Sequence, residues 1–254
     1  MAPMNILKNE GELVSIGEAA KILGVAIQTL RRWDQEGKLV ARKTTGGQRR
    51  YSRPELKRYS SSDIYKIAHL WATNKTPTPL EDDVYCQTRA VFEVRLQRFS
   101  QLLETSGVAG DTFSLIVSAV GEIGNNSFDH NIGNWPDVPG LFFDYDIDLR
   151  QVVLADRGQG ILTTLQRVRP ALYLHTDALE VAFTEVLTGR APEKRGNGLK
   201  FVSRKVIQKG VASITFQTGN AKLSMEAGSS KFNMEITDDH VRGTLVSFEF
   251  NAKN

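Results

Sequence analysis

Features that mark secreted, membrane-spanning or disulfide-bonded proteins are scarce in this sequence. Its 254 residues include one cysteine, Cys86, so no intrachain disulfide can form, and we expect an inert, half-buried thiol there. No segment reaches the roughly 20 apolar residues that a membrane span requires. The first residues, MAPMNILKNEGELVS, contain no apolar signal core. We therefore expect a cytoplasmic protein without a membrane partner.

A large net charge is also absent, since the whole chain carries a formal charge of +3. The charges are nevertheless unevenly distributed. Residues 1–60 contain 12 Lys/Arg and 6 Asp/Glu, whereas residues 61–254 contain 20 and 23. This asymmetry favours a polyanion-binding module attached to a nearly neutral body. The length of the chain also makes two domains the natural expectation.

A compact helical module is predicted near the start of the chain. One helix begins at Ser15, where Glu18 completes a capping box that satisfies two backbone N–H groups. It ends at Gly24, and a second helix spans about residues 26–36. Two helices joined by a glycine-containing turn form the helix-turn-helix pattern. The expected core residues are Leu30, Trp33, Leu39 and Val40.

A β-hairpin is predicted after these helices. Residues 40–52, VARKTTGGQRRYS, have a polar tip with two glycines between two short strands, and Pro54 begins another short helix. Residues near the start of a helix in the major groove reach base edges, where Arg suits guanine and Gln suits adenine. Basic residues of the hairpin suit phosphates. The candidate DNA contacts are Gln28, Thr29, Arg31, Arg32, Arg42, Lys43, Arg49 and Arg50.

The run SIGEAAKILGVAIQTLRRWDQEGKLVARKTTGGQRRYSRPEL resembles the winged helix-turn-helix of MerR-type regulators and excisionase-like proteins. The resemblance covers about residues 13–59. It implies double-stranded DNA as the partner, a homodimer on that DNA, and Arg49, Arg50 and Tyr51 as wing contacts. MerR-type proteins normally continue with a long dimerising helix and a small sensor. Here a much larger domain follows, so metal sensing is unsupported and the mode of dimerisation is open.

The composition of residues 61–82 indicates a short helix at 63–72 followed by a linker. The segment TNKTPTPLEDD contains two prolines and several small polar residues. We therefore divide the chain into a DNA-binding domain (1–60), this connecting segment, and a second domain (83–254).

The second domain is predicted to be an α+β sandwich of two layers with a mixed, mostly antiparallel sheet. Two long helices are expected at residues 83–104 and 111–130, and a third helical stretch is TDALEVAFTEVLTG. The apolar positions of the first long helix include Val84, Val91, Val94, Leu102 and Leu103. The strand-like runs are LFFDYDI, QVVLAD, ASITFQ, KLSMEA, KFNMEI and TLVSFEF.

Two polar residues of the second long helix suit a metal ion and a reacting water. In VGEIGNNSFDHN, Glu122 and Asn126 are four residues apart and share one helical face. A carboxylate can polarise a water there. An amide oxygen one turn away can hold Mg²⁺, which prefers oxygen ligands.

Two further segments carry glycines beside polar groups. In VVLADRGQGIL, an apolar strand ends at Asp156, which can accept a hydrogen bond from a purine amino group. Gly158 and Gly160 allow the backbone to turn tightly beside a ligand. In RGNGLKFVSRKVI, Gly196 and Gly198 precede a helix whose N-terminal N–H groups suit phosphates.

In this order and spacing, the three segments resemble the GHKL ATPases, whose Bergerat ATP-binding fold is shared by histidine kinases, Hsp90, gyrase B and MutL. The resemblance covers about residues 84–252 and implies ATP and Mg²⁺ as ligands. It implies that Glu122 activates water, that Asn126 binds Mg²⁺, and that residues 162–195 form a mobile lid. The other nucleotide contacts would be Asp156, Gly158, Gly160, Ile161, Gly196, Gly198, Leu199 and Thr244.

The sequence departs from that family near the phosphates. Asp129 stands where many members have Lys or Arg, and Lys200 stands where another glycine is common. Lys194, Arg195 or Lys200 could compensate. His69 and His130 lack the context of a phosphoacceptor, so we interpret both as structural and expect no autokinase activity.

These observations favour a bacterial transcriptional regulator whose binding to DNA or to a protein partner is switched by nucleotide. Two alternatives stay open. One is an anti-sigma-type serine/threonine protein kinase, in which Glu122 activates a hydroxyl group. The other is a non-hydrolysing antitoxin or phage or plasmid accessory protein that uses the second domain as an interaction platform. Weak ATPase activity is compatible with the sequence and is not required by it.

Overall fold

The computed structural model describes residues 13–23, 25–35, 39–108, 110–185 and 198–251. The chain forms two compact units, Met1–Asp63 and Ile64–Asn254, which we call the head and the body. Helix α3, Arg53–Thr73, contributes residues to both. In the described part of the chain, none of the helices combines the length and apolar character needed to cross a membrane.

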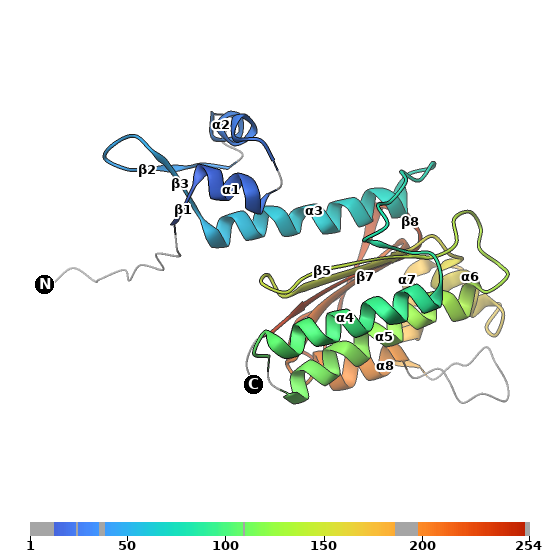
Figure 1. The fold of residues 1–254 in the computed structure, drawn as a ribbon. Coiled ribbons are helices and arrows are strands. Elements are labelled where there is room, and N and C mark those ends of the chain that lie inside the picture. Colours follow the sequence, from blue (N-terminus) through green and yellow to red (C-terminus); the bar gives the residue numbers. More distant parts are fainter. Residues whose placement is uncertain (1–12, 24, 36–38, 109, 186–197, 252–254) are drawn as a thin grey trace, which may run out of the picture. The chain divides into compact units, whose positions relative to one another are not determined.

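The head contains a helix pair and a small antiparallel sheet (Figure 1). Its helices are α1 (Ile16–Ile22) and α2 (Ile27–Gln35). Strands β1 (Leu13–Ser15), β2 (Arg42–Lys43) and β3 (Arg49–Ser52) form a sheet in the order β1-β3-β2. The helix pair and the hairpin agree with the prediction, whereas β1 was not predicted. The buried core of the head consists of Val14, Ala19, Ala20, Leu30, Leu39, Tyr51 and Leu56.

The start of α1 follows the predicted cap in part. The Ser15 hydroxyl accepts a hydrogen bond from the Glu18 N–H at 3.2 Å, as a capping residue should. The Glu18 carboxylate pairs with Arg53, which ties α1 to the start of α3. Val40, which we predicted in the core, is 61% exposed. It lies just before β2, where the chain leaves the core after Leu39.

Helix α3 replaces the two short helices that we predicted after Pro54 and at residues 63–72. The sequence Ser60-Ser61-Ser62 suggested a break, but the helix continues through it. Serine lowers helix propensity by only about 0.5 kcal/mol per residue, which neighbouring turns can offset.

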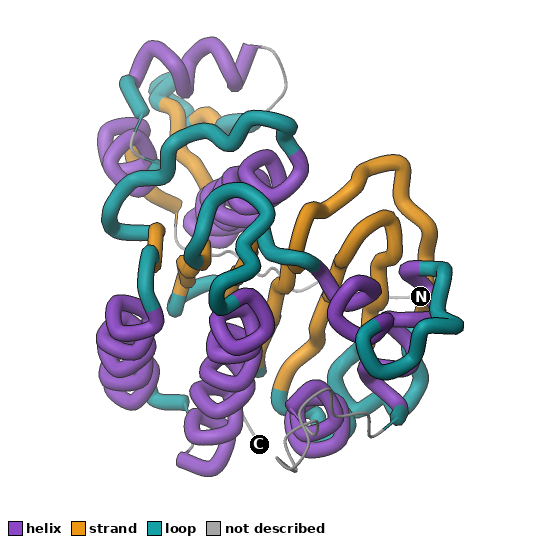
Figure 2. The backbone as a smooth tube through the Cα atoms, turned by 90° about the vertical axis from the view of Figure 1, so that its right-hand side faces the viewer, coloured by secondary structure: helices purple, strands orange, loops and turns teal. Residues whose placement is uncertain are grey.

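The body is built on a five-stranded sheet in the order β4-β5-β6-β8-β7, with antiparallel pairing in every described pair. The strands are the orange segments of the tube in Figure 2. The strands are β4 (Tyr85–Cys86), β5 (Leu141–Asp146), β6 (Gln151–Asp156), β7 (Ala212–Met225) and β8 (Asn233–Phe250). The α+β class is therefore confirmed. The sheet is antiparallel where we expected a mixed one.

Strands β7 and β8 are each longer than predicted. The runs ASITFQ and KLSMEA belong to β7, and KFNMEI and TLVSFEF belong largely to β8. The β7–β8 pairing shifts register on both sides of Gly219, which has φ +56°. A bulge lets the strand continue between the two predicted runs.

Helices cover one face of this sheet. Helices α4 (Arg89–Thr105) and α5 (Gly110–Asn131) lie side by side (Figure 1). Helix α7 (His175–Thr184) follows α6 (Gly160–Gln166), and α8 (Gly198–Phe201) continues into the π-helix η1 (Val202–Ile207).

The apolar residues of α4 are divided between buried and exposed positions. Phe92, Phe99 and Leu103 are buried, whereas Val91, Val94 and Leu102 are exposed. Helix α4 also begins later than expected, because Thr88 caps it with a hydroxyl that accepts a hydrogen bond from Val91 N–H at 3.3 Å. Val84 therefore precedes the helix.

Side chains of the sheet alternate between two apolar clusters. On β6, Val152 and Leu154 join the large cluster with α4 and α5, while Val153 and Ala155 join a smaller cluster on the other face. That smaller cluster includes Ala68, Trp71 and Ala72 of α3. The C-terminal part of α3, which we predicted to belong to a connecting segment, thus packs against the body. It adds a small layer to the two layers that we expected.

Cys86 lies in β4 and is fully buried, rather than half-buried as predicted. Burial raises the pKa of its thiol to about 11, so the group stays protonated near neutral pH.

Candidate functional site

The first candidate site is the surface that α2 and the β2–β3 hairpin present on the head. On α2, Gln28 near the start, Arg31 in the middle and Arg32 in the last turn are exposed, and Thr29 is half-buried. Arg42 and Lys43 are exposed on β2. Arg50, on β3, is half-buried.

The hairpin places like charges directly opposite each other. Arg42 pairs with Arg50 and Lys43 with Arg49 in the β2–β3 ladder. Like charges at opposed positions destabilise a sheet by roughly 0.2–1 kcal/mol per pair. An anion bound across the ladder would relieve this repulsion, so the arrangement is typical of a phosphate-binding surface.

The remaining two predicted contacts face the interior of the head. Tyr51 is 1% exposed and its hydroxyl donates to the carbonyl oxygen of Leu30 at 3.3 Å. The ring of Tyr51 belongs to the core of the head. Our prediction that Tyr51 contacts DNA from the wing was therefore wrong. Arg49 is two residues earlier on the same face of β3, and its Nε lies 2.6 Å from Oδ2 of Asp34.

Asp34 joins α2 to the hairpin. Its Oδ1 accepts a hydrogen bond from Ala41 N–H at 2.9 Å, while Oδ2 accepts from Arg49. The Ala41 hydrogen bond and then the Arg49 contact lower the pKa of Asp34. This carboxylate, which sequence reasoning missed, fixes the hairpin against α2. The only hint in the sequence is a single acid within a basic helix.

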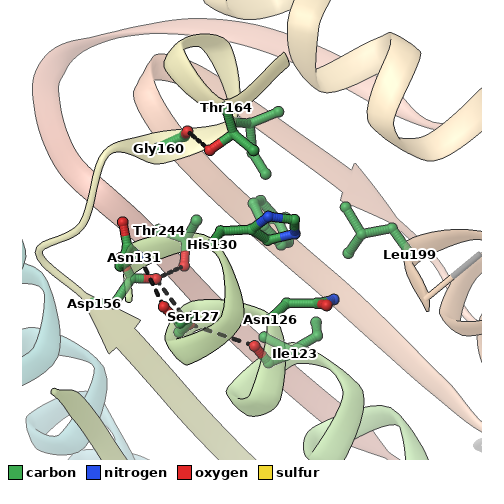
Figure 3. A pocket seen from close by; sticks show the side chains of 12 residues that line it. Ile123, Asn126, Ser127, His130, Asn131, Asp156, Gly160, Thr164, Leu199 and Thr244 are labelled. Carbon is green, nitrogen blue, oxygen red and sulfur yellow. Dashed lines mark hydrogen bonds between the residues drawn. The ribbon is translucent and has the colours of Figure 1, made fainter. Parts of the chain in front are cut away.

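The second candidate site is a pocket in the body between the C-terminal part of α5, the end of β6 and the start of α6 (Figure 3). About 460 Å³ of space lies between its lining residues, and this space includes open solvent. Its polar lining includes Asn126, His130 and Asp156. Its apolar lining consists of Ile123, Ile161, Leu199 and Phe216.

Asp156 is the buried anion of this pocket. Its Oδ2 accepts hydrogen bonds from the hydroxyls of Ser127, at 2.9 Å, and Thr244, and its Oδ1 accepts from Gly158 N–H at 2.8 Å (Figure 3). Burial raises the pKa of Asp156, while these hydrogen bonds oppose that shift. The backbone N–H of Thr244 also hydrogen-bonds this carboxylate, which lines the pocket.

The glycines around Asp156 are required by close contacts. A Cβ on Gly158 would lie 2.1 Å from Nδ2 of Asn131, and one on Gly243 would lie 2.1 Å from Oδ1 of Asp156. Gly160 has φ +74°, in the left-handed region that glycine adopts without strain. The turn after β6 is therefore shaped by the absence of side chains.

Asn131 anchors that turn to α5. Its Oδ1 accepts a hydrogen bond from Gln159 N–H at 2.8 Å, and its Nδ2 donates to the Ser127 carbonyl at 2.8 Å. Ser127 and Asn131 are one helical turn apart and were both missed. The i, i+4 spacing beyond Ile123 in the same helix is the signal that could have found them.

Glu122 and Asn126 lie together one turn further back. Asn126 Nδ2 donates to Glu122 Oε1 at 3.4 Å. A Cβ on Gly198 would lie 2.0 Å from the same oxygen, so α8 begins against this carboxylate. Asn126 lines the pocket and Glu122 adjoins it through this hydrogen bond. The structure thus brings together the Glu122, Asn126 and Gly198 positions that the sequence singled out.

Other predicted positions near the phosphates are placed only in part. Gly196, Lys194 and Arg195 lie outside the described residues, as does the final part of the predicted lid. Its earlier part contains α7, where Leu179 is buried against the sheet. Lys200 on α8 is buried, and burial lowers its pKa, as does the nearby Arg204 charge.

The unfavourable carboxylate that we identified in the sequence is neutralised. Asp129 forms an ion pair with Arg89 of α4, which also reaches the Asn125 carbonyl at 3.5 Å. Of the two histidines interpreted as structural, His69 pairs with Asp239 at 3.2 Å. His130 is exposed at the pocket, and its carbonyl accepts a hydrogen bond from Gln159 Nε2 at 3.3 Å.

Comparison with known proteins gives two findings. Residues 15–51 match the model of the MerR family regulatory protein. A segment of 62 residues is 43% identical to the type II methyltransferase M.Eco47II from Escherichia coli. This segment is 24% of the chain and 14% of the length of the methyltransferase, so the similarity is local. The chain therefore contains a MerR-type helix-turn-helix, which supports DNA binding and a role in transcription regulation.

Proposed function

We propose that this protein is a transcription regulator whose head binds double-stranded DNA and whose body binds a purine nucleotide that alters DNA or partner binding. For the body, the observation that supports this proposal is Asp156, a buried and hydrogen-bonded carboxylate that lines a largely apolar pocket. The fold class, the pocket and the order of the polar residues also agree with the resemblance to GHKL ATPases.

The DNA-binding part rests on charge and geometry. Gln28 near the start and Arg31 in the middle of α2 are exposed, and the N-terminal part of a helix in the major groove meets base edges. The opposed Arg42 and Arg50 form a pair that a phosphate would stabilise. We therefore assign base recognition to α2 and phosphate contacts to the hairpin, with Arg49 holding the hairpin in place through Asp34.

The pocket fits a purine by the type of groups that it offers. Ile123, Ile161 and Phe216 supply apolar surface for a planar ring, and Asp156 supplies an acceptor for an exocyclic amino group. The close approach of Gly158 and Gly243 to the Asp156 network keeps that carboxylate oriented. ATP is the ligand that we propose on these grounds.

Mg²⁺ would be held by the amide oxygen of Asn126, and it would neutralise phosphate charge when bound. Glu122 accepts a hydrogen bond from Asn126; it would orient that amide and would take a proton from a water. Asp129 is compensated by Arg89, so its charge does not oppose a bound triphosphate in full. Hydrolysis is not required for a ligand-dependent switch.

The first experiment measures nucleotide binding by calorimetry with a non-hydrolysable ATP analogue and Mg²⁺. We expect the wild type to bind and Asp156→Asn to lose binding by at least about tenfold, because an amide presents a donor as well as an acceptor. Thr105→Ala serves as a folded control, since Thr105 is exposed at the end of α4 and lies outside the pocket lining. Absence of binding heat in the wild type would contradict the nucleotide proposal.

The second experiment measures DNA affinity by fluorescence anisotropy, on a duplex selected from a random library, with and without ATP and Mg²⁺. Arg42→Ala should lower the slope of log affinity against log salt by about 0.9, as loss of one phosphate contact does. Arg31→Ala should instead reduce discrimination between sequences by about 1–3 kcal/mol. Equal DNA affinity with and without nucleotide would contradict the switch and leave DNA binding standing.

A further inference from the structure

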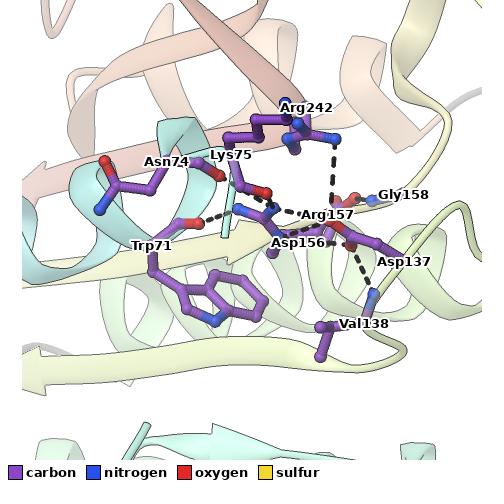
Figure 4. A network of polar contacts seen from close by, with 9 residues as sticks. All are labelled: Trp71, Asn74, Lys75, Asp137, Val138, Asp156, Arg157, Gly158 and Arg242. Atoms are coloured by element: carbon purple, nitrogen blue, oxygen red, sulfur yellow. Dashed lines mark hydrogen bonds and ion pairs between the residues drawn. The ribbon is translucent and has the colours of Figure 1, made fainter. Parts of the chain in front are cut away.

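Arg157 is wholly buried although it carries a charge. It follows Asp156 at the end of β6 and points to the opposite side of the sheet, away from the pocket (Figure 4). Charged side chains are almost never fully buried unless they are paired, because removing them from water is costly. The contacts of this side chain therefore need an explanation.

One partner of Arg157 is a carboxylate. Its Nη2 lies 2.6 Å and its Nε lies 3.0 Å from Oδ2 of Asp137, which places the two groups side by side. The Arg157 hydrogen bond contributes to a lowered pKa of Asp137, against the effect of burial. Asp137 therefore stays ionised at neutral pH and balances the buried charge.

The other partners are backbone carbonyl groups at the C-terminal end of α3. Nη1 donates to the carbonyl of Trp71, and Nη2 donates to those of Asn74 at 3.0 Å and Lys75 at 3.5 Å (Figure 4). The guanidinium carbon also lies 5.9 Å from the centroid of the Trp71 ring. The last carbonyls of a helix lack partners within the helix, and a cation is favourable there. Arg157 is thus the cap of α3.

The pocket and this helix end are joined across a single peptide bond. Asp156 is fixed to Ser127 and Thr244 on the pocket side, and Arg157 is fixed to α3 on the other. A buried, fully hydrogen-bonded guanidinium has discrete favourable positions rather than a continuous range. A small movement of the β6 end therefore changes how well α3 is capped.

We propose that Arg157 is a positioning residue that couples occupancy of the Asp156 pocket to the C-terminal end of α3; this rests on the proposed nucleotide binding. Ligand contacts with Asp156 hold the β6 end in the arrangement that caps α3. By reciprocity, loss of the cap weakens ligand binding by the same factor. Helix α3 runs to Arg53 in the head, where Arg53 pairs with Glu18 of α1, so the chain provides a covalent route toward the DNA-binding module.

The test is amide hydrogen exchange of the full chain, followed by mass spectrometry, with and without ATP and Mg²⁺. In the wild type, nucleotide should slow exchange of residues 64–75 by about fivefold, the lower end of typical coupling. In Arg157→Lys, the pocket should still be protected by nucleotide, while residues 64–75 should no longer respond. Lysine keeps the charge and lacks the planar fork that reaches three carbonyls.

Arg242→Lys is the matched control. Arg242 lies on β8, and its Nη1 is 3.8 Å from the same Asp137 carboxylate. This variant should respond to nucleotide as the wild type does. If Arg157→Lys does not fold, Asp137→Asn removes the charge that holds Arg157 and should abolish the same response. A folded, nucleotide-binding Arg157→Lys in which residues 64–75 still respond like the wild type overturns the proposal.

If the wild type does not bind ATP, the proposed nucleotide binding is contradicted. The coupling between the Asp156 pocket and the end of α3 is then tested without ligand. Asp156→Asn perturbs the pocket side directly. Exchange at residues 64–75 should change in this variant, and the change should disappear when Arg157→Lys is also present. An unchanged exchange rate in Asp156→Asn overturns the coupling independently of any nucleotide.

Discussion

Replacing Asp34 with alanine should destabilise the head by about 3 kcal/mol. The Asp34 carboxylate accepts two hydrogen bonds, from Ala41 N–H at 2.9 Å and from Arg49 Nε at 2.6 Å. Its side chain is 9% exposed and that of Arg49 is 25% exposed, so water screens the pair only weakly. Hydrogen bonds to charged groups contribute about 1.5–3 kcal/mol each, and the lower value gives the total above.

Hydrogen exchange of the β3 amides measures this loss within the head alone. A loss of about 3 kcal/mol corresponds to exchange that is on the order of 100-fold faster, since every 1.4 kcal/mol is a factor of ten. Asp34→Asn should lose about half as much, because the amide oxygen still accepts from Ala41. Glu18→Ala is the matched control, since the Glu18–Arg53 pair is exposed and such pairs contribute about 0–1 kcal/mol. The reasoning is refuted if Asp34→Ala and Glu18→Ala accelerate exchange equally.

The same carboxylate gives a pH dependence with a defined sign. Its pKa is lowered in the folded head relative to the ordinary value of 3.8. The stabilisation is therefore complete above about pH 4 and is lost as the pH falls through the lower, folded value. The difference in stability between wild type and Asp34→Asn should shrink below pH 4, and a constant difference would contradict this assignment.

Three further outcomes are expected. Asp156→Asn should leave the body folded and raise its Tm relative to wild type. The rise should be larger at pH 8 than at pH 4, because burial raises the pKa of Asp156 and penalises its ionised form at high pH. A larger rise at pH 4 would contradict this prediction. Gly158→Ala should cost at least about 2 kcal/mol in urea unfolding of the body, because its Cβ meets Asn131 at 2.1 Å, whereas Gly110→Ala meets nothing within 4 Å and should be neutral or stabilising. Cys86 should react with iodoacetamide only after urea unfolding, and rapid labelling of the native chain would contradict its burial.

Local patterns predicted the centre of the body well. The runs for β5 and β6 end within one residue of the observed strands, because each is a short apolar run bounded by polar turns. Asn126, Asp156 and Thr244 line one pocket as the family resemblance led us to expect. Their roles in binding stay predictions, whereas their positions follow from helix and strand geometry, which fixes where the side chains at each end of an element lie.

Local patterns are less informative where apolar side chains outnumber the buried positions. Helix α4 contains both valines and phenylalanines, and only one set can face the sheet. The aromatic pair Phe92 and Phe99 is buried against Phe143, with ring centroids 5.3 and 6.1 Å away, so Val91 and Val94 are left exposed. Larger rings bury more apolar area per residue, and this decides the rotation of the helix. A count of apolar positions that ignores their area does not predict which face is buried.

The burial of Arg157 follows from a pattern that the sequence already contained. The run Val152–Val153–Leu154–Ala155 is continuously apolar, which is typical of a strand buried on both faces rather than one. Arg157 has the same parity as Val153 and Ala155, so it belongs to the face opposite Asp156. A guanidinium buried there requires a carboxylate and carbonyl oxygens, and no neighbour in sequence can supply them. Its partners at residues 71–75 and 137 come from distant parts of the chain. The local sequence therefore shows that Arg157 needs partners, whereas the fold shows which residues they are.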